Sequence, residues 1–184
     1  MATSKDHAPG LPRPSAWVCR FAPLIPPGGA VLDLACGSGR HLRLLRAMGH
    51  PVTGVDRDIS PLADLAHLPD VEMIEADLEN GSPFPLEGRR FDCVIVTNYL
   101  HRPLLPRLPD LLSSGGLLLY ETFAQGNERF GRPSNPNFLL APGELLEAVR
   151  QQLQVVAYEQ GEVWEPKRAM VQRLAARKME EAQG

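Results

Sequence analysis

The 184-residue sequence lacks the features that mark several specialised classes of protein. Its three cysteines are odd in number and widely spaced, without the pairing of a zinc site or a disulfide framework. Cys36 and Cys93 lie in apolar segments, which favours small buried thiols. No apolar run approaches the about 20 residues of a membrane span. Residues 1–15 also lack the apolar core of a signal peptide. We therefore expect a cytoplasmic protein that neither enters a membrane nor holds a metal.

A strong excess of charge of either sign is also absent. The net charge of −3 gives no global attraction to nucleic acid or to anionic membranes, so nucleic acid is disfavoured and a small-molecule substrate is expected. The length suits one domain, and 43% apolar residues predict a packed core. We predict a flexible arm at residues 1–14, one domain at residues 15–178, and a tail at residues 179–184. Either a monomer or a homodimer is compatible with these features.

The most informative stretch is residues 30–41, AVLDLACGSGRH. An apolar run that contains Asp33 predicts a strand buried on both faces of a parallel sheet. Gly37 and Gly39 follow, and then a helical pattern begins. A strand, a glycine turn and a helix N-terminus direct backbone N–H groups and the helix dipole at a ligand. The glycines matter because a side chain there would hold the ligand away from the backbone.

This stretch lacks the third glycine of the dinucleotide fingerprint G-x-G-x-x-G, because Leu42 stands in its place. Asp33, four positions before Gly37, would also be unfavourable beside a pyrophosphate and suits a ligand with an ammonium group. An NAD-type oxidoreductase is therefore disfavoured but stays open. A glycine turn that only joins a strand to a helix is a further alternative.

Two more acidic residues follow predicted strands. Residues 51–55 form a short apolar strand, and Asp56 comes directly after it. Residues 71–74 form another, which leads into Asp77 in the segment EADLE. A carboxylate after the second strand can accept hydrogen bonds from both hydroxyls of a ribose. The order of acidic residues therefore indicates a nucleoside-containing cofactor.

The rest of the chain continues the alternation of strand and helix. Ser15 is expected to cap a short helix whose Trp17 either packs in the core or, with Arg20, contacts a ligand. A short helix is also expected after Ser60-Pro61, ending near His67, and a broken one after residue 102. Further strands are expected at residues 91–97, 115–123 and 153–159, a helix at 142–150, and a long loop at 124–141. The composition of residues 167–177 favours a helix, but we expect a strand there because the family resemblance given below implies one and tertiary context commonly overrides propensity.

Asp33-x-x-x-Gly37-x-Gly39, with Asp56 and Asp77, resembles the class I S-adenosylmethionine-dependent methyltransferases over residues 15–177. The string GSGRH and the short length are most similar to the bacterial tellurite-resistance type. The strings NYLHRP and ETFAQGNERFGRPSNPNFLL also resemble a signature of bacterial methyltransferases. The resemblance implies an α/β fold: a Rossmann-like three-layer sandwich with a mostly parallel seven-stranded sheet and an antiparallel last strand.

The resemblance further implies S-adenosyl-L-methionine as the cofactor. Asp33 and the glycine turn would hold its amino-acid end, Asp56 its ribose, and Asp77 with Leu78 its adenine. The full expected set of cofactor residues is Asp33, Ala35, Cys36, Gly37, Gly39, Arg40, His41, Asp56, Arg57, Asp77, Leu78, Asn98 and Tyr99.

The implied reaction is an in-line displacement at the sulfonium methyl by a small-molecule or metalloid acceptor. His101, whose ordinary pKa is about 6.5, is the first candidate for a general base. Tyr99 and Glu121 are alternatives, although Tyr99 would also serve as a pocket wall and Glu121 as a partner of Arg129 or Arg132. The expected substrate residues are Arg102, Asn127, Arg129 and Arg132. A non-enzymatic S-adenosylmethionine-binding module and a nucleic-acid methyltransferase remain alternatives.

Overall fold

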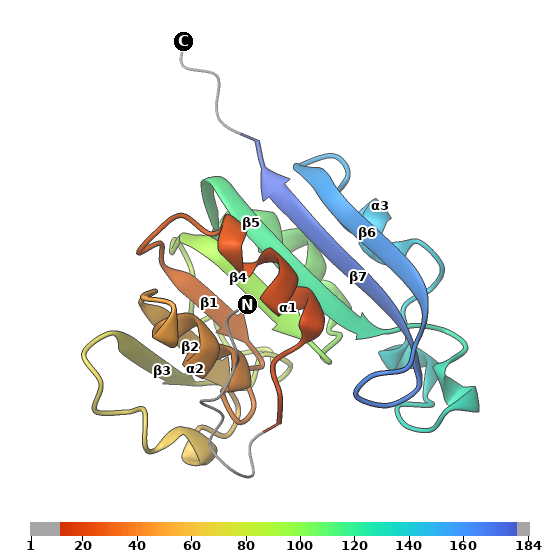
Figure 1. Cartoon of the computed structure of the whole chain (residues 1–184), viewed down its shortest axis with the longest axis horizontal. Coiled ribbons are helices and arrows are strands. Elements are labelled where there is room, and N and C mark those ends of the chain that lie inside the picture. Colours follow the sequence, from red (N-terminus) through yellow and green to blue (C-terminus); the bar gives the residue numbers. More distant parts are fainter. Residues whose placement is uncertain (1–11, 180–184) are drawn as a thin grey trace, which may run out of the picture.

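The computed structural model describes residues 12–179, which contain one seven-stranded sheet with the order β3-β2-β1-β4-β5-β7-β6 (Figure 1). Strands β1 to β5 are parallel, and β7 lies antiparallel between β5 and β6. The predicted arm and tail fall mostly outside the described residues. The strands are β1 (Val31–Leu34), β2 (Val52–Asp56), β3 (Val71–Glu75), β4 (Phe91–Thr97), β5 (Leu112–Phe123), β6 (Leu153–Val163) and β7 (Ala169–Lys178).

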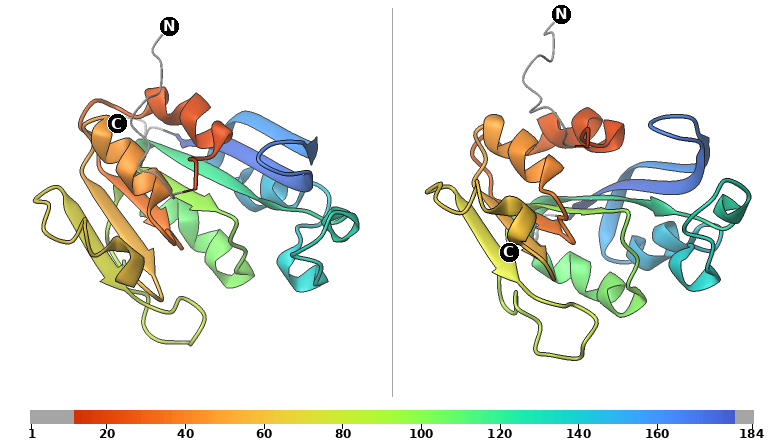
Figure 2. Two further views of the ribbon diagram at one scale, coloured as in Figure 1. Left: turned by 60° about the horizontal axis from the view of Figure 1, so that its bottom comes forward. Right: turned by 90° about the horizontal axis from the view of Figure 1, so that it is seen from below.

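Helices cover both faces of this sheet, which makes the predicted three-layer sandwich (Figure 2). The helices α1 (Ala16–Phe21) and α2 (Arg40–Ala47) lie on one face. The 3-10 helix η3 (Arg102–Leu111) and the helix α3 (Glu144–Val149) lie on the other. Alternate side chains of each central strand therefore enter opposite cores, so these strands are mostly apolar, with Asp33 as a buried exception.

The helix α1 is fixed by its own cap and by Trp17. The Ser15 hydroxyl accepts hydrogen bonds from the Trp17 and Val18 amides. The indole Nε1 of Trp17 donates to the Leu174 carbonyl at 3.0 Å, and the side chain is buried. Arg20 forms an ion pair with Glu159 at 3.1 Å. The core interpretation of Trp17 is therefore confirmed, and Arg20 is engaged with β6.

The helix α2 approaches β2 closely because Gly54 has no side chain. A Cβ at Gly54 would stand 2.7 Å from Leu42 Cδ1 and 3.0 Å from the Cys36 sulfur. Leu42 and Leu45 are buried as the helical spacing predicts. His41 in the first turn is also buried, whereas Met48, which follows the last helical residue Ala47, is 43% exposed.

Proline residues and strand pairing determine where the remaining helices and strands begin and end. The expected helix at 60–67 is a 3-10 turn, η2 (Ser60–Leu62), whose N-cap is Ile59 and not Ser60. Between β4 and β5 the described chain forms only 3-10 structure, because Pro106 and Pro109 stand inside it.

The last strand is antiparallel as expected, and β6 is longer than expected because it pairs with β7 as far as Val163. The long loop contains η4 (Asn127–Arg129) and η5 (Pro136–Phe138), and η1 (Ala22–Leu24) follows α1. No helix within residues 12–179 has the length and apolar character to span a bilayer.

Gly54→Ala is expected to destabilise the protein by about 1–3 kcal/mol, because the added methyl overpacks the α2–β2 contact. Leu42→Ala alone is expected to cost about 2–5 kcal/mol by leaving a cavity. The double variant should lose less than the sum of the two, since each change relieves the other. Urea unfolding of the three variants and the wild type measures this coupling, and strict additivity would contradict the contact.

Candidate functional site

The candidate site lies at the carboxyl ends of β1 and β4, where the sheet order reverses. The chain leaves β1 toward α2 on one face and leaves β4 toward η3 on the other, and such a switch point opens a crevice for ligands. Ala35 and Asn98, directly after these strands, both have a φ of 55°. Non-glycine residues rarely adopt this left-handed conformation, and strained backbone of this kind clusters at ligand sites.

The glycine turn is joined to the end of β2. The Gly37 amide donates to Asp56 Oδ2 at 2.8 Å, and Asp56 Oδ1 also accepts from the Asp58 amide at 3.2 Å. A Cβ on Gly37 would meet nothing within 4 Å, so the backbone there is open to a ligand. A Cβ on Gly39 would stand 2.4 Å from Leu62 Cδ2 and the φ here is 72°, so another residue would strain the backbone and displace the Leu62 side chain.

Asp33 is a buried carboxylate without a donor. Its exposure is 1%, and neither side-chain oxygen has a hydrogen-bond partner in residues 12–179. The His41 Nδ1 lies 3.7 Å away, while His41 Nε2 accepts from the Ser15 amide at 3.1 Å. A buried carboxylate without hydrogen bonds is costly, so a ligand that brings a cation or an N–H group would stabilise it.

A pocket of about 450 Å³ opens in front of the glycine turn. It is lined by Ala35, Asp56, Arg57, Ala76, Asp77, Leu78, Glu79, Tyr99 and Phe138. Six of the expected cofactor residues therefore lie together here. Three lining residues were missed by the sequence analysis. Ala76 and Glu79 belong to the string EADLE, but Phe138 comes from the long loop and no local pattern marks it.

The other expected cofactor residues stand behind or beside this pocket. Arg40 donates to the Thr97 hydroxyl at 3.3 Å and to the Arg13 carbonyl at 3.2 Å, which ties α2 to β4. Burial raises the pKa of the Cys36 thiol, and the carboxylates of Asp33 and Asp56 raise it further. Cys36 is therefore a protonated, unreactive side chain.

Tyr99 closes the pocket as a protonated phenol. Burial raises its pKa above the ordinary range, and the carboxylates of Glu79, Asp77 and Asp56 add to the shift. Its backbone carbonyl accepts from the buried Tyr120 hydroxyl at 2.8 Å. Tyr99 can donate a hydrogen bond to a ligand, but its expected alternative role as a general base has no support in this environment.

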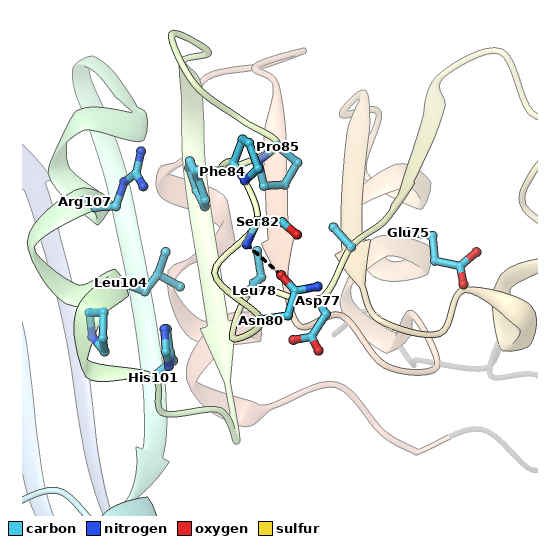
Figure 3. Close-up of a pocket in the computed structure, with 13 residues that line it drawn as sticks. Glu75, Asp77, Leu78, Asn80, Ser82, Phe84, Pro85, His101, Leu104 and Arg107 are labelled. Carbon is cyan, nitrogen blue, oxygen red and sulfur yellow. Dashed lines mark hydrogen bonds between the residues drawn. The ribbon is translucent and has the colours of Figure 1, made fainter.

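His101 lies in a neighbouring pocket of about 350 Å³. Figure 3 shows His101, Leu104 and Arg107 along η3, facing the segment with Leu78 and Phe84. The His101 Nδ1 is 4.0 Å from a Glu79 oxygen. The side chain of His101 makes no capping hydrogen bond to η3, and it does not meet Glu121 or the expected substrate arginines.

Glu121 and most of the expected substrate residues are held by other partners. Glu121 pairs with Arg173 instead of Arg129 or Arg132, because β7 places Arg173 beside it. Arg102 binds the Glu144 carboxylate at 2.7 Å and the carbonyls of residues 137 and 139, so it fastens the loop to α3.

Two further substrate candidates also have structural roles. Asn127 is 2% exposed and bonds to the backbone of Pro133 and Met170. Arg129 lies 3.6 Å from Glu162. Tertiary partners therefore hold Arg102, Asn127 and Arg129, and none of the three lines the groove of Arg132. Arg132 alone lines an open groove of about 500 Å³.

The comparisons agree with this geometry. A family model for the methyltransferase domain matches residues 31–116. The trans-aconitate 2-methyltransferase of Rhizobium meliloti (strain 1021) is 37% identical over 97 residues, which cover 50% of this chain. The chain spans only 37% of the length of that relative.

Two solved structures share the fold. TehB from Haemophilus influenzae has a TM-score of 0.70 at 22% identity, covering 88% of this chain and 61% of TehB. The Burkholderia thailandensis 1,6-didemethyltoxoflavin-N1-methyltransferase, solved with S-adenosylhomocysteine, has a TM-score of 0.67 at 23% identity and covers 90% and 77%. The chain therefore has the fold of these two solved methyltransferases, and its residues 31–116 match the methyltransferase domain model.

Proposed function

We propose that the protein binds S-adenosyl-L-methionine and transfers its methyl group to a small-molecule acceptor. The observation that carries this proposal is the buried carboxylate of Asp33, which lacks a hydrogen-bond donor at the strand that leads into the glycine turn. The amino group of the cofactor is a donor of the kind that this carboxylate requires. The open backbone at Gly37 leaves room for the ligand beside it.

The rest of the pocket suits the nucleoside half of the cofactor. Asp56 uses one lone pair of each oxygen for the Gly37 and Asp58 amides, and a carboxylate has further lone pairs for ribose hydroxyls. Asp77 uses Oδ1 for the Glu79 amide, which leaves Oδ2 for the adenine amino group. The negative side chains of this pocket disfavour a dinucleotide pyrophosphate, which argues against the NAD alternative.

The chain's own contribution to the reaction is alignment. When bound, the cofactor would supply a methyl group on a cationic sulfonium. The leaving group is then a neutral thioether, which does not need to be protonated. The protein then has to hold the acceptor nucleophile in line with that methyl group. Tyr99 is protonated, Glu121 is paired with Arg173, and His101 lies at the adenine end, beside Leu78. We therefore propose an acceptor whose nucleophile is already deprotonated at neutral pH, such as a carboxylate or a metalloid oxyanion. The trans-aconitate specificity in the name of the R. meliloti relative supports a small acceptor.

Asp56→Ala is expected to weaken the binding of S-adenosylhomocysteine by about 10- to 100-fold, or about 1.4–2.8 kcal/mol. The change removes the ribose acceptor and the carboxylate that orients the Gly37 amide. Asp64→Ala is the matched control, because Asp64 pairs with Arg43 on the surface and does not line the pocket. Isothermal titration calorimetry of both variants and the wild type gives the affinities. Binding of NAD in preference to S-adenosylhomocysteine by the wild type would overturn the proposal.

His101→Gln is expected to change kcat by less than about threefold and to leave the pH profile of kcat/KM unaltered. The reason is that His101 faces η3 and the Phe84 segment and not the Arg132 groove. A screen for S-adenosylhomocysteine release across carboxylates, thiols, phenols, amines and oxyanions of selenium and tellurium supplies the acceptor for this assay. A larger fall in kcat together with a changed pH profile would show that His101 acts as the base.

A further inference from the structure

We infer that the methyl acceptor is an amphiphilic anion, with an oxyanion group bound by Arg132 and Lys167 and an apolar part packed on Phe123 and Phe138. This inference rests on the proposed function and names the chemistry of its acceptor. The groove concerned, which we call the Arg132–Lys167 groove, is lined by Phe123, Arg132, Pro133, Ser134, Asn135, Phe138 and Lys167. Its volume of about 500 Å³ is large enough for a small organic acid.

Both cations of this groove lack an anionic partner. Within residues 12–179, neither Arg132 nor Lys167 forms a hydrogen bond or an ion pair, and Lys167 Nζ lies 6.0 Å from the centre of the Phe123 ring. No carboxylate of the described chain is among the lining residues. Two positive side chains that converge without a counter-charge attract an oxyanion, and a guanidinium can bind it through two hydrogen bonds.

Unlike Arg132 and Lys167, the neighbouring arginines form ion pairs. Arg129 and Arg168 share Glu162, at 3.6 and 2.9 Å. Arg173 is held by Glu121 and Glu159. Glu121, Glu159 and Glu162 are thereby used by other cations. Glu165, in the turn before Lys167, is not among the residues that line the groove, so no lining carboxylate neutralises its positive charge.

Phe138 links the groove to the cofactor pocket, because its side chain lines both. It is 50% exposed, which leaves one face of the ring available to a ligand. The two cavities that Phe138 lines differ in net charge: three carboxylates (Asp56, Asp77 and Glu79) outnumber the single cation Arg57 in the pocket, and two cations line the groove. An anion is repelled from the first and attracted to the second, so it binds next to the cofactor without competing for its site.

The experiment uses ¹⁵N-labelled protein saturated with S-adenosylhomocysteine. We expect trans-cinnamate and phenyl phosphate, a carboxylate and a phosphate with the same apolar ring, to shift the amide signals of Ser134, Asn135, Phe138 and Lys167. Neutral cinnamamide, which has the shape of cinnamate, should bind at least about tenfold more weakly than the anion. The ratio of the two anion affinities distinguishes a carboxylate site from a phosphate site.

The double variant Arg132→Gln/Lys167→Gln should weaken anion binding by at least about tenfold and leave the affinity for S-adenosylhomocysteine within about twofold. Arg20→Gln/Arg150→Gln removes the same charge from exposed residues outside the groove and serves as the control. Two results would overturn the inference, provided that S-adenosylhomocysteine still binds. One is equal affinity for cinnamate and cinnamamide, and the other is an unchanged anion affinity in the double variant. Loss of S-adenosylhomocysteine affinity in the double variant would overturn it too, because the cations would then hold the cofactor. Failure of the wild type to bind S-adenosylhomocysteine would instead overturn the proposed function.

Discussion

Burial of the parallel sheet on both faces is the constraint on which the rest of this structure depends. Since helices cover both faces, ligands can approach the central strands only at their ends. The turns after β1 and β4 adopt left-handed backbone at Ala35 and Asn98, and Asp56 holds the Gly37 amide in place from the end of β2. The pocket exists because these three chain segments reach one edge of the sheet and then diverge.

The two cavities lined by Phe138 differ in net charge. Carboxylates outnumber Arg57 in the cofactor pocket, which suits hydroxyls, an amino group and a cationic sulfonium. The charged residues that line the Arg132–Lys167 groove are both cations, and the others are apolar or neutral. In a methyl transfer, the acceptor would bind in the groove and the cofactor in the pocket, and both would contact Phe138. The general bases expected near the reaction are then unnecessary, because an anionic nucleophile is already deprotonated.

The periodicity and the order of turns predicted the strands and the pocket well, because both depend on local sequence. Asp56, Asp77 and the glycine turn each follow a strand, and parallel strands bring their carboxyl ends to one edge. The contacts of the expected substrate residues could not be predicted from the sequence. Arg102 and Arg129 have the same chemistry as Arg132, and nothing in their neighbours along the chain separates them. Their roles differ because Glu144 and Glu162, distant in sequence, pair with the first two.

By itself the sequence determined the sheet, the glycine turn and the acidic residues of the cofactor pocket, because strand burial and turn chemistry are properties of short segments. Only the tertiary structure decided which charged side chains remain available. The antiparallel β7 brings Arg173 to Glu121, and the loop that follows β5 brings Phe138 to the cofactor pocket. These partners lie far apart along the chain, so their pairing is decided by packing and by the competition of cations for a limited number of carboxylates.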